Sequence, residues 1–178
     1  MRMLIGGLII LSFAGSGVAE NVSSPPRDEV IRGLTEAEIS ALQQGLGMGR
    51  ARAAELNGYP GPRHVLDLAQ AGKLALAPEQ VRTAQRLFDG MAREAQRLGD
   101  LILREERSLE AEFRAGGVSE TNLHARALRI AALEGELRAV HLRAHIEMRA
   151  ALSGPEIQQY NALRGYVEAP EHQHKPHH

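Results

Sequence analysis

The chain has 178 residues, contains no cysteine and carries a formal net charge of −1 at neutral pH. The length is typical of one domain, the lack of cysteine excludes disulfides and thiolate metal sites, and the near-zero charge argues against a nucleic-acid partner. Ala and Leu make up most of the apolar content and Arg and Glu are frequent, a composition that favours helices.

The first 19 residues, MRMLIGGLIILSFAGSGVA, have the pattern of a secretory signal peptide. Arg2 precedes an apolar stretch, and small residues follow, with Gly17 and Ala19 at the −3 and −1 positions of a cleavage site. The apolar stretch has about a dozen residues, fewer than the roughly 20 that span a bilayer as a helix. An uncleaved anchor is therefore the less favoured alternative, and we expect a secreted, periplasmic protein that begins near Glu20.

Residues 20–33 have the composition of a flexible leader, with Ser-Ser-Pro-Pro at its centre. A helix is predicted to begin at Thr35 and to continue to about Gln44. Thr35 and Glu38 have the spacing of a capping box, in which each side chain accepts a hydrogen bond from the other residue's backbone N–H. A short helical continuation over residues 49–56 is compatible with the pattern.

Two segments rich in Gly and Pro interrupt the helices, because Gly permits positive φ and Pro lacks a backbone donor. They are GLGMG (45–49) and NGYPGP (57–62). A short helix is predicted directly after them, in RHVLDLAQAGKL (63–74). The first segment follows no strand and no Gly-Lys-Ser/Thr appears, so a nucleotide-binding loop is not predicted.

Two long helices are predicted over residues 78–115 and 120–152, because their apolar residues recur at spacings of three and four, interrupted in the first helix only at Glu105. At about 1.5 Å per residue the first would be roughly 55 Å long. Glycines in GGVSE (116–120) separate the two helices. A last short helix starts with a second capping box, formed by Ser153 and Glu156. The seam positions are Val81, Ala84, Phe88, Met91, Ala95, Leu98, Ile102 and Leu109 in the first helix and Leu123, Ala127, Ile130, Leu133, Leu137, Val140, Ala144 and Met148 in the second.

No alternating β pattern is present, so the sequence predicts an all-α fold over residues 34–166. We expect a long antiparallel helical hairpin with short flanking helices, hooked together as four or five helices, and a disordered His-rich tail over residues 167–178. One helix pair cannot cover both of its own faces. Either the short helices lie across the pair or two chains pack together, and we expect a homodimer.

The order of these elements, with the helix stop LSGPE (152–156) and the ending YNALRGY (160–166), resembles the periplasmic Spy/CpxP proteins and the related heavy-metal resistance sensors of nickel–cobalt type. The resemblance covers roughly residues 30–166. The hallmark of that family is a Leu-Thr-x-x-Gln motif, which LTEAE (34–38), LAPEQ (76–80) and LSGPE match in part.

The hallmark motif has a plain physical meaning, because a hydroxyl at the helix start and a Gln or Glu three residues later form a capping box. Ala77 replaces the hydroxyl residue in LAPEQ, which should weaken that helix start by roughly 1 kcal/mol. Glu156 stands where Gln is expected in LSGPE. The motif therefore indicates fold and not activity.

The resemblance implies activities that involve binding without turnover. Some members bind nickel, cobalt or similar ions through His, Met and carboxylate side chains, some are ATP-independent chaperones that hold unfolded clients, and some dock on a membrane-bound stress sensor. No Ser or Thr has a recognisable nucleophile context and cysteine is absent, so an enzyme is not predicted. We expect a metal-binding, heavy-metal-resistance or envelope-stress protein, with the chaperone and the docking regulator as alternatives.

The segment HLRAHIEM (141–148) is the predicted metal site. His141 and His145 are four residues apart, which places them side by side on a helix, where two imidazoles can share one ion at about 2.0–2.1 Å for zinc. Met148 adds a thioether, which suits softer ions. Nickel, cobalt, zinc and copper are all candidates.

If the hairpin turns near residue 117, the segment that faces the two histidines contains Asp89, Met91 and Glu94, which are the second-choice ligands. The alternative is that His141 and His145 are edge residues of the seam, hydrogen-bonded to Glu or Asp across the hairpin. The metal sensors use an additional His pair and a glutamate on earlier segments, whereas His64 is the one histidine before the hairpin in this sequence.

Further histidines lie in the tail, at His172, His174, His177 and His178. Such residues bind transition ions readily and with little selectivity; the alternative is a tail without function or a cloning remnant. His124, near the turn between the long helices, is expected to be an exposed helix residue.

Overall fold

The computed structural model describes residues 31–166, and in this range it contains six helices and no strand. The predicted all-α class is therefore confirmed. The helices are α1 (Glu36–Gln44), α2 (Arg52–Glu55), α3 (Pro62–Gln70), α4 (Pro78–Ala115), α5 (Glu120–Ala150) and α6 (Gly154–Arg164). The predicted signal peptide, nearly all of the leader and the His-rich tail lie outside the described residues. Between residues 31 and 166, no helix combines the length and the apolar character needed to cross a bilayer.

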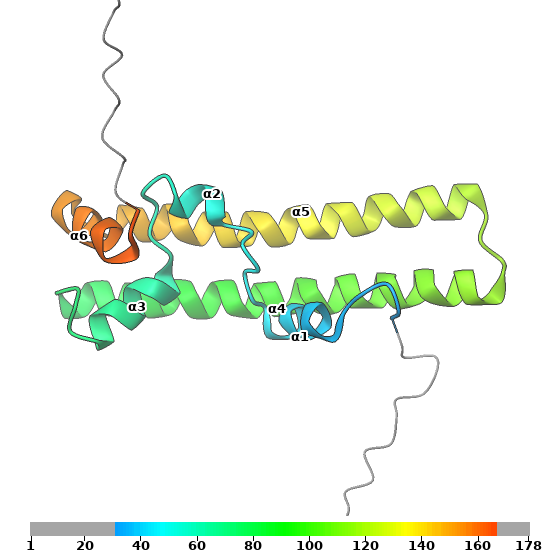
Figure 1. Ribbon diagram of the computed structural model, residues 1–178, viewed down its shortest axis with the longest axis horizontal. Coiled ribbons are helices and arrows are strands. Elements are labelled where there is room, and N and C mark those ends of the chain that lie inside the picture. Colours follow the sequence, from blue (N-terminus) through cyan, green and yellow to red (C-terminus); the bar gives the residue numbers. More distant parts are fainter. Residues whose placement is uncertain (1–30, 167–178) are drawn as a thin grey trace, which may run out of the picture.

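The two long helices α4 and α5 lie side by side and are joined by a short connection at residues 116–119 (Figure 1). Helices α1 and α3 pack against α4, and α2 and α3 pack against α5. The short helices thus cover part of one long pair, and the segments between them cross from α4 to α5.

Side-chain capping starts α1, α5 and α6, and the pairs at α1 and α6 are the ones that the sequence predicts. The backbone N–H of Glu38 donates to Thr35 Oγ1 at 3.2 Å, and the N–H of Thr35 donates to the Glu38 carboxylate at 2.8 Å, which completes the predicted box. At α6 the Glu156 carboxylate accepts from the N–H and the hydroxyl of Ser153, at 2.7 and 2.8 Å. Ser119 Oγ accepts from the N–H of Asn122 at the start of α5.

Gln80 of the LAPEQ motif connects three helices. Its side-chain oxygen accepts from the N–H of Ala77 at 2.9 Å, so half of the capping box forms although Ala77 has no hydroxyl. The amide nitrogen of Gln80 donates to the backbone carbonyl of Ala151 at 3.1 Å and to Glu156 Oε2 at 2.9 Å. The motif therefore fixes the start of α4 against the junction of α5 and α6.

The hydrophobic core consists of two clusters along the long pair. The first, where α1 meets α4 and α5, contains Ile31, Leu42, Ala95, Leu98, Ile102, Leu103, Leu133 and Leu137. The second, where α3 and α6 meet the other end of the pair, contains Val65, Leu74, Ala84, Met148, Leu152 and Tyr160. Residues 85–94 of α4 and 138–147 of α5 contribute no buried member to either cluster. The pair is thus packed on both sides of a central gap.

The predicted seam is buried only in part. Val81 and Leu123 are exposed, and near the connection at 116–119 the large apolar side chains of Phe113 and Leu128 are 56% and 58% exposed. No short helix lies over this end of the long pair in Figure 1. A regular spacing of apolar residues predicts burial only where another element covers the seam.

Candidate functional site

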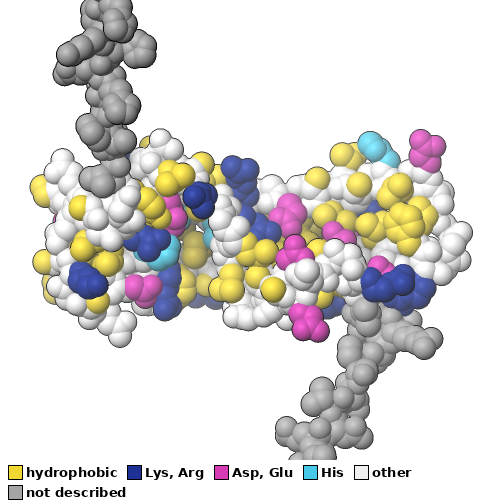
Figure 2. Space-filling view, viewed as in Figure 1, with side chains coloured by type: hydrophobic (Ala, Val, Ile, Leu, Met, Phe, Trp, Pro, Cys, Tyr) yellow, Lys and Arg dark blue, Asp and Glu magenta, His cyan; other side chains and the backbone are white. Residues whose placement is uncertain are grey.

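The gap between the two clusters holds a cavity of about 330 Å³. The loop after α1, α2, the start of α3, and the facing sides of α4 and α5 form its walls. On the face of the molecule drawn in Figure 2, histidine side chains lie partly covered among basic, acidic and apolar ones. The lining residues are Gly45, Leu46, Gly47, Met48, Gly49, Ala51, Arg52, Glu55, Gly61, Pro62, Arg63, His64, Phe88, Met91, His141 and His145.

His141 and His145 of α5 line the cavity and are nearly fully buried, at 3% and 6% exposure. His141 Nδ1 lies 2.9 Å from the backbone carbonyl of Leu137, and His145 Nδ1 lies 2.8 Å from that of Tyr59. Because a carbonyl oxygen can only accept a hydrogen bond, the hydrogen-bond network assigns the proton to Nδ1 in both rings. Each Nε2 therefore carries a lone pair.

His141 Nε2 is buried and makes no hydrogen bond of good geometry among the described residues, although the Gly45 carbonyl lies near enough to the ring to raise its pKa. An unsatisfied buried polar atom costs about 1–3 kcal/mol and calls for an explanation, such as a bound ion. This nitrogen lies in the wall of a cavity that also contains His145. It is the strongest local indication that the cavity accommodates a ligand.

Both imidazoles are held in their neutral form. Burial lowers the pKa of His141 below its ordinary value of 6.5, helped by the positive charge of Arg50 and opposed by the hydrogen bond to the Leu137 carbonyl. Burial likewise lowers the pKa of His145, opposed by the Tyr59 carbonyl and by the charge of Glu55. Neutral imidazole is the form that coordinates metal ions.

Two glycines make room for the histidine rings. A Cβ atom at residue 61 would lie 2.8 Å from His145 Cε1 and 3.1 Å from Nε2, and one at residue 47 would lie 3.2 Å from His141 Cδ2. Side chains at Gly47 and Gly61 would therefore displace the rings. The segments that the sequence marks only as helix breaks are the segments that admit the imidazoles.

A second layer of contacts fixes the carbonyl that orients His145. The Arg149 guanidinium donates to the Gly58 carbonyl and lies 4.7 Å from the centre of the Tyr59 ring. The N–H of Gly61 donates to the hydroxyl oxygen of the buried Tyr160 at 3.3 Å. Burial raises the pKa of Tyr160 to about 12, so the hydroxyl stays protonated. The loop over the cavity is thus anchored to α5 and α6.

Besides Arg52 and Arg63, the structure adds to the cavity three residues with possible metal-donor atoms that the sequence did not indicate as site residues. Glu55 Oε1 lies 3.2 Å from His64 Nδ1, and Glu55 Oε2 accepts from the Tyr166 hydroxyl at 3.2 Å. Met48 lies in the glycine-rich loop. The signal that could have identified Glu55, His64 and Met48 is their position in or next to the two Gly- and Pro-rich segments.

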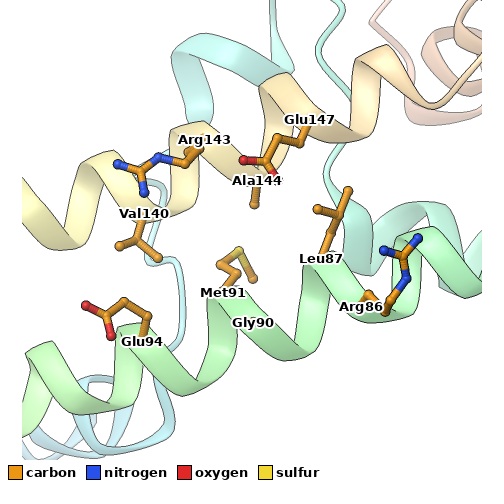
Figure 3. Close-up of a pocket in the computed structure, with 9 residues that line it drawn as sticks. All are labelled: Arg86, Leu87, Gly90, Met91, Glu94, Val140, Arg143, Ala144 and Glu147. Atoms are coloured by element: carbon orange, nitrogen blue, oxygen red, sulfur yellow. The ribbon is translucent and has the colours of Figure 1, made fainter.

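Of the predicted second-choice ligands, the structure brings one to the cavity. Met91 lines it, and Met91 also lines a second cavity of about 240 Å³ between α4 and α5, where it points toward Ala144 (Figure 3). Glu94 lines only that second cavity and is hydrogen-bonded to Arg97 at 2.6 Å. The prediction that Glu94 faces His141 is therefore wrong, because the two residues line different cavities.

Asp89 and Met148 also lie away from the cavity. Asp89 accepts from Gln85 on its own helix at 2.8 Å, since it lies roughly 200° around α4 from Met91. Met148 is completely buried in the second core cluster. The alternative prediction, histidines bonded to Glu or Asp across the pair, is also wrong, because their Nδ1 partners are backbone carbonyls.

The remaining predicted ligands, His172, His174, His177 and His178, lie outside the described residues. Within residues 31–166, no three His, Asp or Glu side chains lie close enough as they stand to hold one ion. The donors gathered at the cavity are instead two imidazole nitrogens, with thioethers and the Glu55–His64 pair nearby. Comparison with protein families, with curated proteins and with solved structures finds no match to this chain.

Proposed function

We propose that this chain is a non-enzymatic, transition-metal-binding protein of the Spy/CpxP type that acts in the periplasm, in heavy-metal resistance or the envelope-stress response. The observation that carries the proposal is the pair of neutral imidazoles in one cavity. His141 and His145 each donate from Nδ1 to a backbone carbonyl, which leaves a lone pair on Nε2, and His141 Nε2 makes no hydrogen bond of good geometry among the described residues.

The surroundings of the rings support this proposal. Histidines that bind metals commonly donate their other ring N–H to a backbone carbonyl, which fixes the tautomer and the orientation of the ring. The carbonyls of Leu137 and Tyr59 occupy that role here. Apolar side chains at positions 141 and 145 could pack with the two core clusters, whereas burial of two imidazoles there lowers the stability of the fold. An ion that binds only the folded state would offset that loss.

In this proposal α4 and α5 form the long antiparallel hairpin of the family, with the short helices at its open end, and two chains form a dimer. The alternative activities, chaperoning of unfolded clients or docking on a membrane-bound sensor, would use an apolar surface of the same hairpin. They do not require His141 or His145, which makes the alternatives separable by substitution.

The test is calorimetric titration of zinc, nickel and copper(II) into the full chain. All variants carry His172, His174, His177 and His178 changed to Gln, so that the tail does not compete. We expect one ion to bind per chain with micromolar or tighter affinity. His141→Gln and His145→Gln should each weaken binding by about tenfold to a hundredfold or more. His124→Gln, an exposed residue near the start of the same helix, is the matched control.

Circular dichroism on each variant checks that the helices are intact. If no ion binds once the tail histidines are changed, or if His141→Gln binds as tightly as the His124→Gln control, a metal function for this cavity is contradicted. The chaperone would then be the stronger candidate, and suppression of client aggregation would be the next measurement.

A further inference from the structure

Two methionines line the cavity together with the two histidines. Met48 lies in the loop after α1 and Met91 lies on α4, and both line the same cavity as His141 and His145. The third methionine of the described residues, Met148, is buried in the second core cluster and does not line this cavity. The two methionines therefore come from two elements other than the helix that carries the histidines.

The position of Met48 has no packing explanation. Its φ of 46° is the one positive φ of a non-glycine residue among the described residues. A side chain in this region of φ and ψ is strained, and such strain is concentrated at functional sites. Met48 is 49% exposed, so burial does not offset the strain. Glycine adopts a positive φ at low cost, as Gly45 and Gly49 of the same loop do at 66° and 76°, so glycine at residue 48 would avoid this strain.

Hard oxygen donors are scarce in the same cavity. Among the described residues that line it, Glu55 is the one carboxylate, and its two oxygens contact His64 and Tyr166. Apart from His64, whose Nδ1 is paired with Glu55, the donors that remain are two imidazole nitrogens and two thioethers. Thioethers bind copper(I) well, whereas nickel(II), cobalt(II) and zinc(II) favour nitrogen, oxygen and thiolate ligands.

We propose that the cavity is a site for copper(I), bound by Nε2 of His141 and His145 together with the thioethers of Met48 and Met91. This inference rests on the proposed metal-binding function and specifies its ion. His64, which is half-buried and paired with Glu55 at the rim, lies outside the proposed ligand set.

The test measures copper(I) affinity by competition with a chromophoric copper(I) chelator, under anaerobic conditions, on the full chain with the four tail histidines changed to Gln. Met48→Leu and Met91→Leu keep the side-chain volume and remove the sulfur. Each should weaken copper(I) binding by about tenfold or more while leaving zinc(II) affinity within about twofold. Met148→Leu, in the separate core cluster, is the matched control and should change neither affinity.

X-ray absorption at the copper edge supplies an independent measurement, because sulfur bonded to copper(I) is distinguishable from nitrogen and oxygen. We expect sulfur bonded to copper in the control variant and less of it in Met48→Leu and Met91→Leu. Copper(I) bound by nitrogen alone, or unchanged affinity in both Leu variants, would overturn this inference. If zinc(II) binding still depended on His141 and His145, the proposed function would stand; if neither ion bound, both would fail.

Discussion

Each buried histidine of this chain has its two ring nitrogens in different environments. Nδ1 of His141 and of His145 is hydrogen-bonded to a carbonyl, and Nε2 lies at the cavity. Burial lowers both pKa values, so each ring excludes a proton at neutral pH. The charged and titratable groups that act on them are Arg50 and His145 at His141, and Glu55 and His64 at His145.

The lowered pKa values predict a loss of stability in acid. Between the lowered pKa and the ordinary value of 6.5, the unfolded chain binds more protons than the folded chain, so the free energy of unfolding falls as pH falls through 6.5. The dependence ends below the lowered pKa, where both states are protonated. The free energy of unfolding can be measured by urea titration at several pH values from about 8 to about 5. Its decrease with falling pH should be smaller in His141→Gln than in His124→Gln. Equal decreases would contradict the assignment.

At the scale of elements, α1 meets α4 by a direct approach of backbones at Gly99. This glycine is buried in the middle of α4, and a Cβ atom there would lie 2.1 Å from the backbone carbonyl oxygen of Leu42. The contact is with backbone, which cannot rotate away as a flexible side chain can. Gly99 therefore sets the distance between the two helices, and with it the start of the 45–49 loop that lines the cavity.

Gly99→Ala should destabilise the protein although Ala is the better helix former. The gain in helix propensity is about 1 kcal/mol, whereas overpacking against rigid backbone costs about 1–3 kcal/mol or more. Gly135→Ala, on an exposed position of α5 with nothing within 4 Å of the added Cβ, is the matched control and should stabilise by about 0.5–1 kcal/mol. Chemical unfolding measures both, and a stabilised Gly99→Ala would show that α1 is free to move away.

At the scale of the whole molecule, the two ends of the long pair are packed differently. The end near α6 is covered by α3 and α6 (Figure 1). The end near residues 116–119 exposes Phe113, Leu123 and Leu128. Exposed apolar side chains of this size are favoured where another surface covers them. The homodimer that the sequence predicts would bury them.

Sedimentation equilibrium tests this expectation. The full chain should have the mass of a dimer at micromolar concentration, and Phe113→Ser with Leu128→Ser should shift the equilibrium toward the monomer, since burial of each large side chain contributes about 1.5–3 kcal/mol. Leu46→Ser, which is also exposed but lies at the cavity, is the matched control and should leave the mass unchanged. A dimer that resists both apolar substitutions would have its interface elsewhere.

The sequence by itself determined the elements that depend on near neighbours in the chain. Capping pairs such as Thr35 with Glu38 act over three residues, glycines end helices at the residue where they stand, and the spacing of apolar residues gives the long helices. The same local geometry placed His141 and His145 on one side of α5. These features follow from the sequence because the interacting groups are within one or two helical turns.

Only the tertiary structure decided which residues meet the two histidines. The donors at the cavity come from the 45–49 loop, α2, the start of α3 and α4, and their approach depends on how α1 and α3 pack on the long pair. Counting residues on both sides of a helix connection predicts the height at which two residues lie along the helix pair, but not the direction in which each side chain points around its helix. Met91 was therefore predicted correctly as a lining residue, whereas Glu94 and Asp89 were not. Met148 is buried in the core because α3 and α6 cover it, which agrees with its place in the apolar seam and not with its predicted role as a ligand.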